Sequence, residues 1–204
     1  MRSDSINIVS PVIEQIQKRN NKIINAEANR YTRDGDLINL KQKYRYNRAL
    51  GPYQPSLNGS DFPSIYEELV EYTRYNASTG KILEGITKDG IMHAFIWGYD
   101  DQLPIVYGKG IGYDALLIAH NEALSAQDYQ LAIRDHANTK NALITTYQHD
   151  PLIGITEAVD PAGITIAYEY DEFRRLYKVL DNNEFTIAKP NTTSEYRLLP
   201  GSYL

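Results

Sequence analysis

The chain has 204 residues, with 42% apolar and 23% charged residues, as in one folded domain over residues 1–204. Its net charge of −5 argues against a nucleic-acid surface or an anionic membrane as partner. The absence of cysteine excludes disulfides and thiolate sites, no apolar run reaches membrane-spanning length, and residues 1–15 lack the apolar segment of a signal peptide.

Residues 12–46 are predicted to form antiparallel hairpins. The chain holds 17 tyrosines against four phenylalanines and one tryptophan, and tyrosine suits a strand surface that is half buried. Asn20-Asn21 and Asp34-Gly35 tolerate the positive φ that tight hairpin turns demand. A helix over residues 12–30 is the alternative, because Gln, Lys, Glu and Ala are good helix formers, but the turn spacing favours hairpins.

An irregular connection is expected next, since residues 47–64 hold three prolines and two glycines without periodicity. Strand signals resume over residues 65–107. The turns within this part are predicted at Asn76–Gly80, Asp89-Gly90 and Asp100–Gln102.

Residues 113–142 lose the strand pattern and are rich in Ala and Leu. Asp114 is a candidate N-cap, and Ser125 followed by Asp128 forms a loose capping box. We therefore predict a helical pair inserted into a β protein, and we expect deletion of the insert to leave a folded β protein. The expected helices span about 115–124 and 126–138.

Strands return from residue 143, and one hairpin among them has the clearest pattern, "AYEYDEFRRLYKVLDNNEF" over residues 167–185. The tyrosines alternate with smaller or polar residues, so they share one face of a strand. The aspartate that follows can accept backbone N–H groups at the start of a turn. The motif comprises Tyr168, Tyr170, Asp171, Arg175, Leu176 and Asp181.

This hairpin recurs within the chain. Residues 72–90 again contain spaced tyrosines, Asn in place of Asp, a turn ending at Gly80-Lys81 that is one residue longer, and a return strand. Residues 31–40 form a looser copy. Recurrence of this kind indicates repeat architecture, in which each unit buries its face by stacking on the next.

The segment "GITIAYEYDEFRRLYKVLD" resembles a YD repeat, also called an RHS repeat. The usual form is Gly, a few residues, Tyr-x-Tyr-Asp, two variable residues, Gly-Arg-Leu, a short strand and Asp. Arg174 takes the place of the usual glycine, whereas Arg175 and Leu176 match. The resemblance covers residues 66–110 and 143–185 and is weaker over 10–60.

The resemblance implies a mainly β fold of consecutive antiparallel hairpins in a curved RHS/YD-type sheet. Such sheets wind into a hollow shell around cargo, often a toxin, in secreted or cell-surface proteins of bacteria. The implied function is a non-catalytic structural scaffold, with an extracellular or cell-surface location and no cofactor. The alternative is a surface carbohydrate-binding or protein-binding adhesion module, which the tyrosine content and the loop at 47–64 support.

Patterns that could carry chemistry are incomplete. His120-Asn121-Glu122 matches half of a zinc-deaminase motif whose other half requires cysteine. "GKGIG" at 108–112 has the wrong glycine spacing for a dinucleotide loop. The histidines have no metal-ligand spacing, so we expect no metal, cofactor or catalytic residue; they are His93, His120, His136 and His149.

Three further patterns have a structural and a functional interpretation. Glu67, Glu68 and Glu71 read as a solvated strand face or as paired carboxylates. Trp97 is interpreted either as a core residue or as a residue that stacks on a sugar. Asp160–Gly163 has the letters of a self-cleavage motif of RHS shells, but we predict a plain turn.

An antiparallel sheet that does not close has two edge strands with unpaired N–H and C=O groups. Pro190 and Pro200 can blunt the C-terminal edge, whereas the strands near the N-terminus look long. We therefore expect a protein partner at an edge, either a second copy or the remainder of a split RHS shell.

Overall fold

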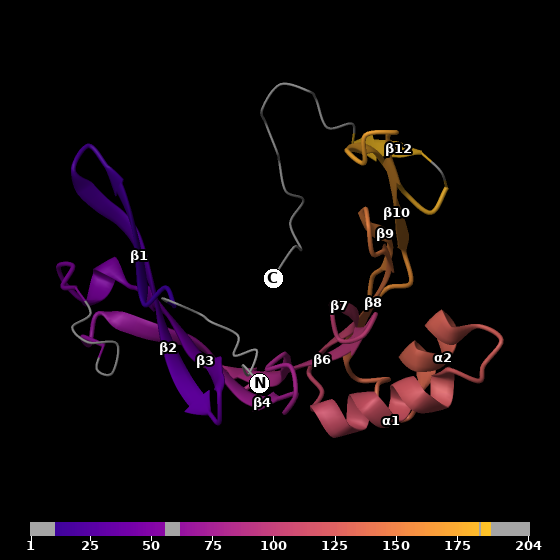
Figure 1. Cartoon of the computed structure of the whole chain (residues 1–204), viewed down its shortest axis with the longest axis horizontal. Coiled ribbons are helices and arrows are strands. Elements are labelled where there is room, and N and C mark those ends of the chain that lie inside the picture. Colours follow the sequence, from indigo (N-terminus) through magenta and orange to yellow (C-terminus); the bar gives the residue numbers. More distant parts are fainter. Residues whose placement is uncertain (1–10, 56–61, 184, 189–204) are drawn as a thin grey trace, which may run out of the picture. The chain divides into compact units, whose positions relative to one another are not determined.

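The computed structural model describes residues 11–55, 62–183 and 185–188. In this part of the chain twelve strands follow one another in one sheet in the order of the sequence (Figure 1). Strand neighbours with a defined register are antiparallel, which confirms the predicted mainly β fold of consecutive hairpins with a helical pair. The strands are β1 (Glu14–Arg19), β2 (Lys22–Asp34), β3 (Leu37–Tyr46), β4 (Tyr66–Tyr75), β5 (Ile82–Thr87), β6 (Met92–Gly98), β7 (Leu103–Lys109), β8 (Leu143–Asp150), β9 (Gly154–Val159), β10 (Thr165–Tyr170), β11 (Leu176–Leu180) and β12 (Thr186–Ala188).

The chain divides into two compact units. The first unit comprises Met1–Phe95 and Gly108–Leu117, and the second comprises Ile96–Tyr107 and Ile118–Leu204. The single domain expected from the sequence stays a prediction.

The first unit begins with two tight hairpins at the predicted turns. Asn20 and Asn21, between β1 and β2, have φ of 49° and 60°. Gly35, between β2 and β3, has φ of 57°, and the flanking Asp34 and Leu37 pair directly. The left-handed backbone matches the twist of the strands, as expected of short hairpin loops. The hairpin prediction for this region is therefore confirmed, and the helical alternative is wrong.

The segment predicted to be an irregular connection, residues 47–64, contributes to the core of the first unit. Its described residues include a short 3-10 helix, Arg48–Leu50, capped by the Asn47 side chain. Tyr53 and Phe62 pack against a buried cluster to which β2 and β4 contribute residues. The cluster consists of Ala26, Ala28, Ile65 and Tyr66. Small residues on β2 thus leave room for aromatic rings supplied by the connection.

Two helices, α1 (Tyr113–Ala123) and α2 (Tyr129–Asp135), lie within the predicted insert. The predicted N-caps are wrong. Asp114 lies inside the first turn of α1, and the carboxylate of Glu84 on β5 accepts the hydrogen bond of the Tyr113 N–H at 2.8 Å. Asp128 caps α2 by accepting from Leu131 N–H at 2.9 Å, so this helix begins later than predicted. Ser125 instead donates its hydroxyl to the Glu122 carbonyl, at the end of α1.

The helices supply some of the most deeply buried side chains of the chain. These are Leu116, Ala119, Ala123 and Ile133, each at most 3% exposed. Thr139, also fully buried, donates its hydroxyl to carbonyls at the end of α2. Neither helix in the described residues is long and apolar enough to cross a membrane.

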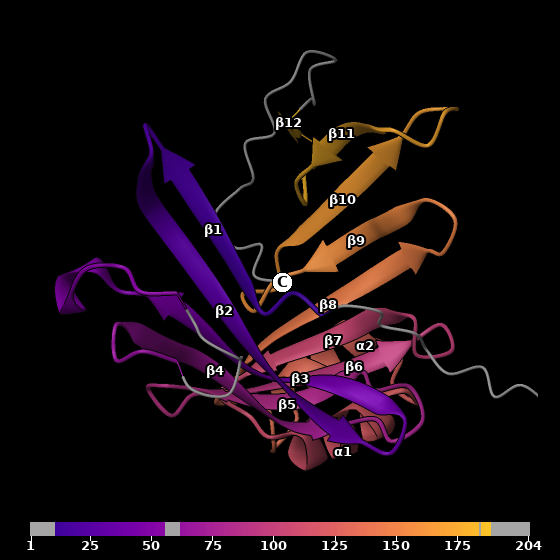
Figure 2. The same ribbon diagram turned by 60° about the vertical axis from the view of Figure 1, so that its left-hand side comes forward.

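The C-terminal hairpins of the second unit run from β8 to β12, and β8, β9 and β10 lie side by side (Figure 2). Val159 on β9 lies opposite Thr146 on β8 and Thr165 on β10. Tyr168 on β10 lies opposite the buried Val179 on β11. Pro190 and Pro200, expected to blunt this end, lie outside the described residues.

Candidate functional site: hairpin turns anchored by a carboxylate

The turn between β10 and β11 is organised by Asp171. Its backbone N–H donates to the Arg175 carbonyl at 2.9 Å, and its own carbonyl accepts from Arg174 N–H at 2.9 Å. One carboxylate oxygen accepts the backbone N–H groups of Phe173 and Arg175, both at 2.9 Å. The carboxylate therefore satisfies donors that the turn would otherwise leave to water.

Arg175 completes this turn. Its guanidinium reaches the second oxygen of Asp171 through Nε at 2.8 Å and Nη2 at 2.7 Å. The hydrogen bond from this side chain, followed by the backbone N–H bonds, holds the pKa of the Asp171 carboxyl below its usual value. Every oxygen of this carboxylate is thus engaged, which suits a structural role better than proton transfer.

Arg174, where the YD pattern usually has glycine, occupies the strained position of the turn. Its φ is 61°, in the left-handed region, and its side chain is exposed. Gly163 occupies the equivalent position of the preceding turn, with φ of 84°. The backbone geometry of this position is therefore kept even where the glycine is not.

The same turn recurs three times along the C-terminal hairpins, at intervals of eleven and ten residues. Asp160 N–H donates to the Ile164 carbonyl at 3.0 Å, and Asp181 N–H donates to the Phe185 carbonyl at 3.0 Å. The Asp160 carboxylate accepts two backbone N–H groups at 2.8 Å, and the Asp181 carboxylate accepts two at 2.9 Å. Asp181, predicted to close one repeat, therefore opens the next turn. Asp160–Gly163 forms a turn, as predicted, while its cleavage chemistry is not tested.

The tyrosine directly before the turn fixes it to the preceding strand. The Tyr170 hydroxyl donates to the Ile155 carbonyl on β9 at 2.8 Å. Gly154 makes this approach possible, because a Cβ at that position would lie 2.9 Å from the Tyr170 hydroxyl oxygen. Of the other motif residues, Leu176 pairs opposite Tyr170 across the hairpin, whereas Tyr168 pairs further along opposite Val179.

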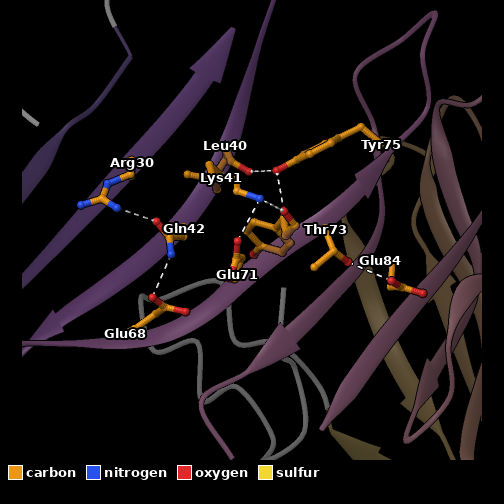
Figure 3. A network of polar contacts seen from close by, with 10 residues as sticks. Arg30, Leu40, Lys41, Gln42, Glu68, Glu71, Thr73, Tyr75 and Glu84 are labelled. Atoms are coloured by element: carbon orange, nitrogen blue, oxygen red, sulfur yellow. Dashed lines mark hydrogen bonds and ion pairs between the residues drawn. The ribbon is translucent and has the colours of Figure 1, made fainter. Parts of the chain in front are cut away.

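The recurrence predicted at residues 72–90 has the same features in the first unit. The Tyr75 hydroxyl donates to the Leu40 carbonyl on β3 at 2.6 Å, as Figure 3 shows. The Asn76 side chain accepts the backbone N–H groups of Ser78 and Thr79, and Gly80 has φ of 69°. Burial raises the pKa of Tyr75 to about 12, which keeps the phenol a donor at neutral pH. The looser copy at residues 31–40 is also a hairpin, but it has a two-residue turn.

The glutamates of β4 form cross-strand contacts instead of a carboxylate pair. Glu71 pairs with Lys41 at 2.9 Å, and Glu68 accepts from Gln42, which in turn accepts from Arg30 (Figure 3). A carboxylate oxygen of Glu67 lies 3.5 Å from Nζ of Lys88, which follows β5. Each carboxylate thus has its own partner, on β3 for Glu68 and Glu71 and in the turn after β5 for Glu67.

The remaining candidates are separated by the fold. His120 Nδ1 lies 2.7 Å from the Tyr129 hydroxyl, while Glu122 faces His136, so the His-x-Glu side chains do not converge. Within the described residues, no three His, Asp or Glu side chains are grouped to hold a metal ion. Trp97 lies half-buried on β6, and the "GKGIG" glycines end β7 and precede α1.

Sequence reasoning missed one cluster, at the N-terminus of α1. Glu84 accepts both the Tyr113 N–H and the Thr73 hydroxyl, each at 2.8 Å. Arg74 pairs with Asp114 at 2.7 Å and lies over the Tyr113 ring at 4.6 Å. Nothing local in the sequence signals the contacts of Glu84 and Arg74 with α1, because they join residues 29 to 40 positions apart.

Comparisons with solved structures give 19 matching chains. No protein-family model matches the sequence, and no curated protein matches it. A crystal structure of TcdB2-TccC3 matches with a TM-score of 0.39 and 8% sequence identity over 79% of this chain. The match covers 7% of that chain, so this protein spans a small part of its length. A likeness at this level carries no argument about function.

Proposed function

We propose that this chain is a non-catalytic structural scaffold, a segment of an RHS/YD-repeat shell. The observation that carries the proposal is the recurring turn anchored by Asp160, Asp171 and Asp181 between strands that pair in sequence order. Each turn is closed by its own carboxylate, so hairpins can be added in series without altering those before them.

The engagement of the reactive side chains supports the non-catalytic part of the proposal. One oxygen of each turn carboxylate accepts two backbone N–H groups, and Glu68 and Glu71 of β4 face an amide and a cation on β3. Glu14 is contacted by the hydroxyls of Tyr53 and Tyr66. Groups held in this way stabilise strands and turns.

The location and cargo follow from the same proposal. RHS/YD shells belong to secreted or cell-surface bacterial proteins, and many enclose a polymorphic toxin. We place this chain in that setting, where the tyrosine hydroxyls and turn carboxylates hold successive hairpins together. The absence of cysteine agrees with a scaffold held by hydrogen bonds.

The proposed partner joins an edge of the sheet. β1 and β12 are the first and last strands in the order, so each has one neighbour within the described residues. Ile16 on β1 and Ile187 on β12 are 39% and 45% exposed. We propose that one of these edges pairs with a second copy of the chain or with the remainder of a split shell.

Multi-angle light scattering at micromolar concentration tests the self-pairing form. Ile16→Lys and Ile187→Lys place a charge on each edge in turn, and Ile24→Lys on the interior strand β2 is the matched control, since Ile24 is 58% exposed. We expect an oligomer that the relevant edge variant dissociates and the control does not. A monomer that also fails to bind the protein products encoded beside it in the genome would contradict the edge proposal.

Glycan screening separates the scaffold from the adhesion alternative. A scaffold is expected to bind no glycan, whereas an adhesion module binds one and loses it in Trp97→Ala. Binding that this substitution abolishes would overturn the scaffold proposal.

A further inference from the structure

The first strand of the sheet, β1, is regular along its outer edge. The register between β1 and β2 shifts between Gln17 and Lys18, and the extra residue of this bulge is Ile24 on β2. β1 therefore keeps an unbroken alternation of side chains over Glu14–Arg19. Bulges and short length both hinder pairing at an edge, and β12, the last strand, has three residues. Of the two edges, β1 is thus the one better suited to pairing.

The backbone of β1 presents alternate residues to this edge. The Asn29 N–H donates to the Ile13 carbonyl at 2.7 Å, so Ile13 is hydrogen-bonded toward β2. Residues of this kind alternate along an antiparallel pair, so the N–H and C=O groups of Glu14, Ile16 and Lys18 point away from β2. Within the described residues no strand lies on that side of β1. A further strand placed there would exchange hydrogen bonds with these three residues.

Symmetry decides which residues face one another when two copies of β1 pair. Opposed residues of an antiparallel pair point to the same face, so the even residues of one copy meet the even residues of the other. A twofold axis at Ile16 places Ile16 opposite itself and Glu14 opposite Lys18 of the second copy. Gln15 then lies opposite Gln17 of the second copy. Two pairs of opposite charge thus flank one apolar contact.

The neighbouring registers lack this complementarity. An axis at Gln17 places Lys18 opposite Ile16, and an axis at Lys18 places two lysines opposite each other. An axis at Gln15 places Glu14 opposite Ile16. Like charges that are directly opposed destabilise a strand pair, so the axis at Ile16 is favoured over the other three.

The side chains of β1 are held ready for this register. Oε1 of Glu14 accepts the hydroxyl of Tyr53 at 2.9 Å and also contacts the hydroxyl of Tyr66, so the carboxylate is held in place beside the edge. Ile16 pairs with the fully buried Ala26 on β2 but is itself 39% exposed. A second Ile16 would cover this side chain at the margin of the buried cluster.

We propose that β1 is the self-association edge of this chain, and that two copies pair through it antiparallel about an axis at Ile16. This inference rests on the edge pairing proposed above, and it assigns that pairing to one strand, one occupant and one register. The same surface is used by both copies, so the contact closes as a dimer and does not extend into a fibre. β12 takes no part in it.

Cysteine cross-linking tests the register, because the chain contains no cysteine. In the proposed dimer Gln15 and Gln17 of the second copy form a non-hydrogen-bonded pair with Cα atoms about 4.5 Å apart, which a disulfide can span. A mixture of Gln15→Cys and Gln17→Cys chains is therefore expected to form a covalent dimer under mild oxidation. In either variant alone the two cysteines are diagonal neighbours about 7–8 Å apart, so cross-linking should be much slower.

Charge reversal tests the pairing of Glu14 with Lys18. Lys18→Glu turns both pairs of opposite charge into like-charge pairs, so it is expected to raise the dimer dissociation constant about tenfold or more in analytical ultracentrifugation. Arg19→Glu is the matched control, because it makes the same change of charge at the next residue, which faces the uncharged Ile13 of the second copy. It is expected to change the constant by less than about threefold.

The outcomes separate this inference from the proposed function. Cross-linking that requires the mixture, together with weakening by Lys18→Glu and not by Arg19→Glu, supports the dimer. Cross-linking that is equally fast in each variant alone, or an effect of Lys18→Glu no larger than that of Arg19→Glu, would overturn it. A monomer that binds the protein products encoded beside it overturns the dimer but leaves the scaffold proposal intact. Glycan binding that Trp97→Ala abolishes overturns the scaffold proposal instead.

Discussion

Replacing Arg174 by glycine is expected to stabilise the hairpin β10–β11. Arg174 holds a left-handed backbone, with φ of 61°, which costs a residue with a Cβ atom about 1–2 kcal/mol. Glycine removes that cost, but it is more flexible in the unfolded chain, and this flexibility reduces the gain in stability by about 0.5–1 kcal/mol. The exposed Arg174 side chain makes no described hydrogen bond or ion pair, so its loss adds little. The net expectation is a gain of about 0.5–1 kcal/mol.

Two further variants isolate the backbone origin of this gain. Arg174→Ala removes the same side chain but keeps the Cβ atom, so it is expected to leave the stability nearly unchanged. Gly163→Ala introduces a Cβ atom at the equivalent position of the preceding turn, where φ is 84°, and is expected to destabilise by about 1 kcal/mol or more.

The assay is urea unfolding of each variant, together with amide hydrogen exchange of β10 and β11 in the same variants. For a chain of this length a gain of 1 kcal/mol raises Tm by about 2–4 °C, and the midpoint should shift without a change in the slope m. Exchange protection is the more direct measurement, because two compact units need not unfold together. If Arg174→Gly and Arg174→Ala have equal stability, backbone strain does not explain this turn.

Five other changes test the turns, the cap of α1, a buried phenol and the helical insert. Gly80→Ala is expected to lower the free energy of unfolding by about 2–3 kcal/mol, because φ is 69° and the new Cβ atom would lie 2.8 Å from a side-chain oxygen of Asn39. Gly90→Ala, with φ of 80° but open space around it, should cost only about 1 kcal/mol in the same urea titration. Glu84→Ala is expected to destabilise by about 1–2 kcal/mol and to reduce exchange protection at the start of α1, with Glu84→Gln milder because one acceptor remains. The pKa of Tyr75 is raised to about 12, so the contribution of its hydroxyl to folding stability is present below pH 10 and is lost as pH rises through 12. In an absorbance titration, Tyr75→Phe should remove one phenol that ionises at high pH. Deleting residues 113–142 is expected to unfold the chain, as measured by circular dichroism, because the insert carries five deeply buried side chains.

The sequence predicted features that depend on neighbouring residues. Asn20-Asn21 and Asp34-Gly35 specify their hairpins through local backbone preference, and the alternation before Asp171 specifies its strand. The positive φ of Arg174 was not predicted, because arginine rarely adopts it and the residue that replaces the usual glycine left the turn geometry open.

Features that join distant residues were missed. Glu84 caps α1 from a strand, so the local candidate Asp114 is displaced by a carboxylate 29 positions away from the helix start. The connection at 47–64 has an irregular sequence pattern, yet its described residues Tyr53 and Phe62 pack against the cluster that contains Ala26 and Ala28 of β2. The expectation that the insert is dispensable rested on its change of pattern, and burial of its side chains argues against it.

The motif Tyr-Asp thus combines a local and a non-local function in two adjacent residues. The carboxylate of Asp171 closes its own turn within five residues, so the hairpin needs no other part of the chain to define its geometry. The hydroxyl of Tyr170 reaches back to a carbonyl of the preceding strand, so the same hairpin is held in register against its predecessor. Tyr75 and Asn76 make the corresponding contacts in the first unit, so this combination occurs in both compact units. A chain built from such units extends one hairpin at a time, and each new hairpin adds the acceptor carbonyls that the next one can use.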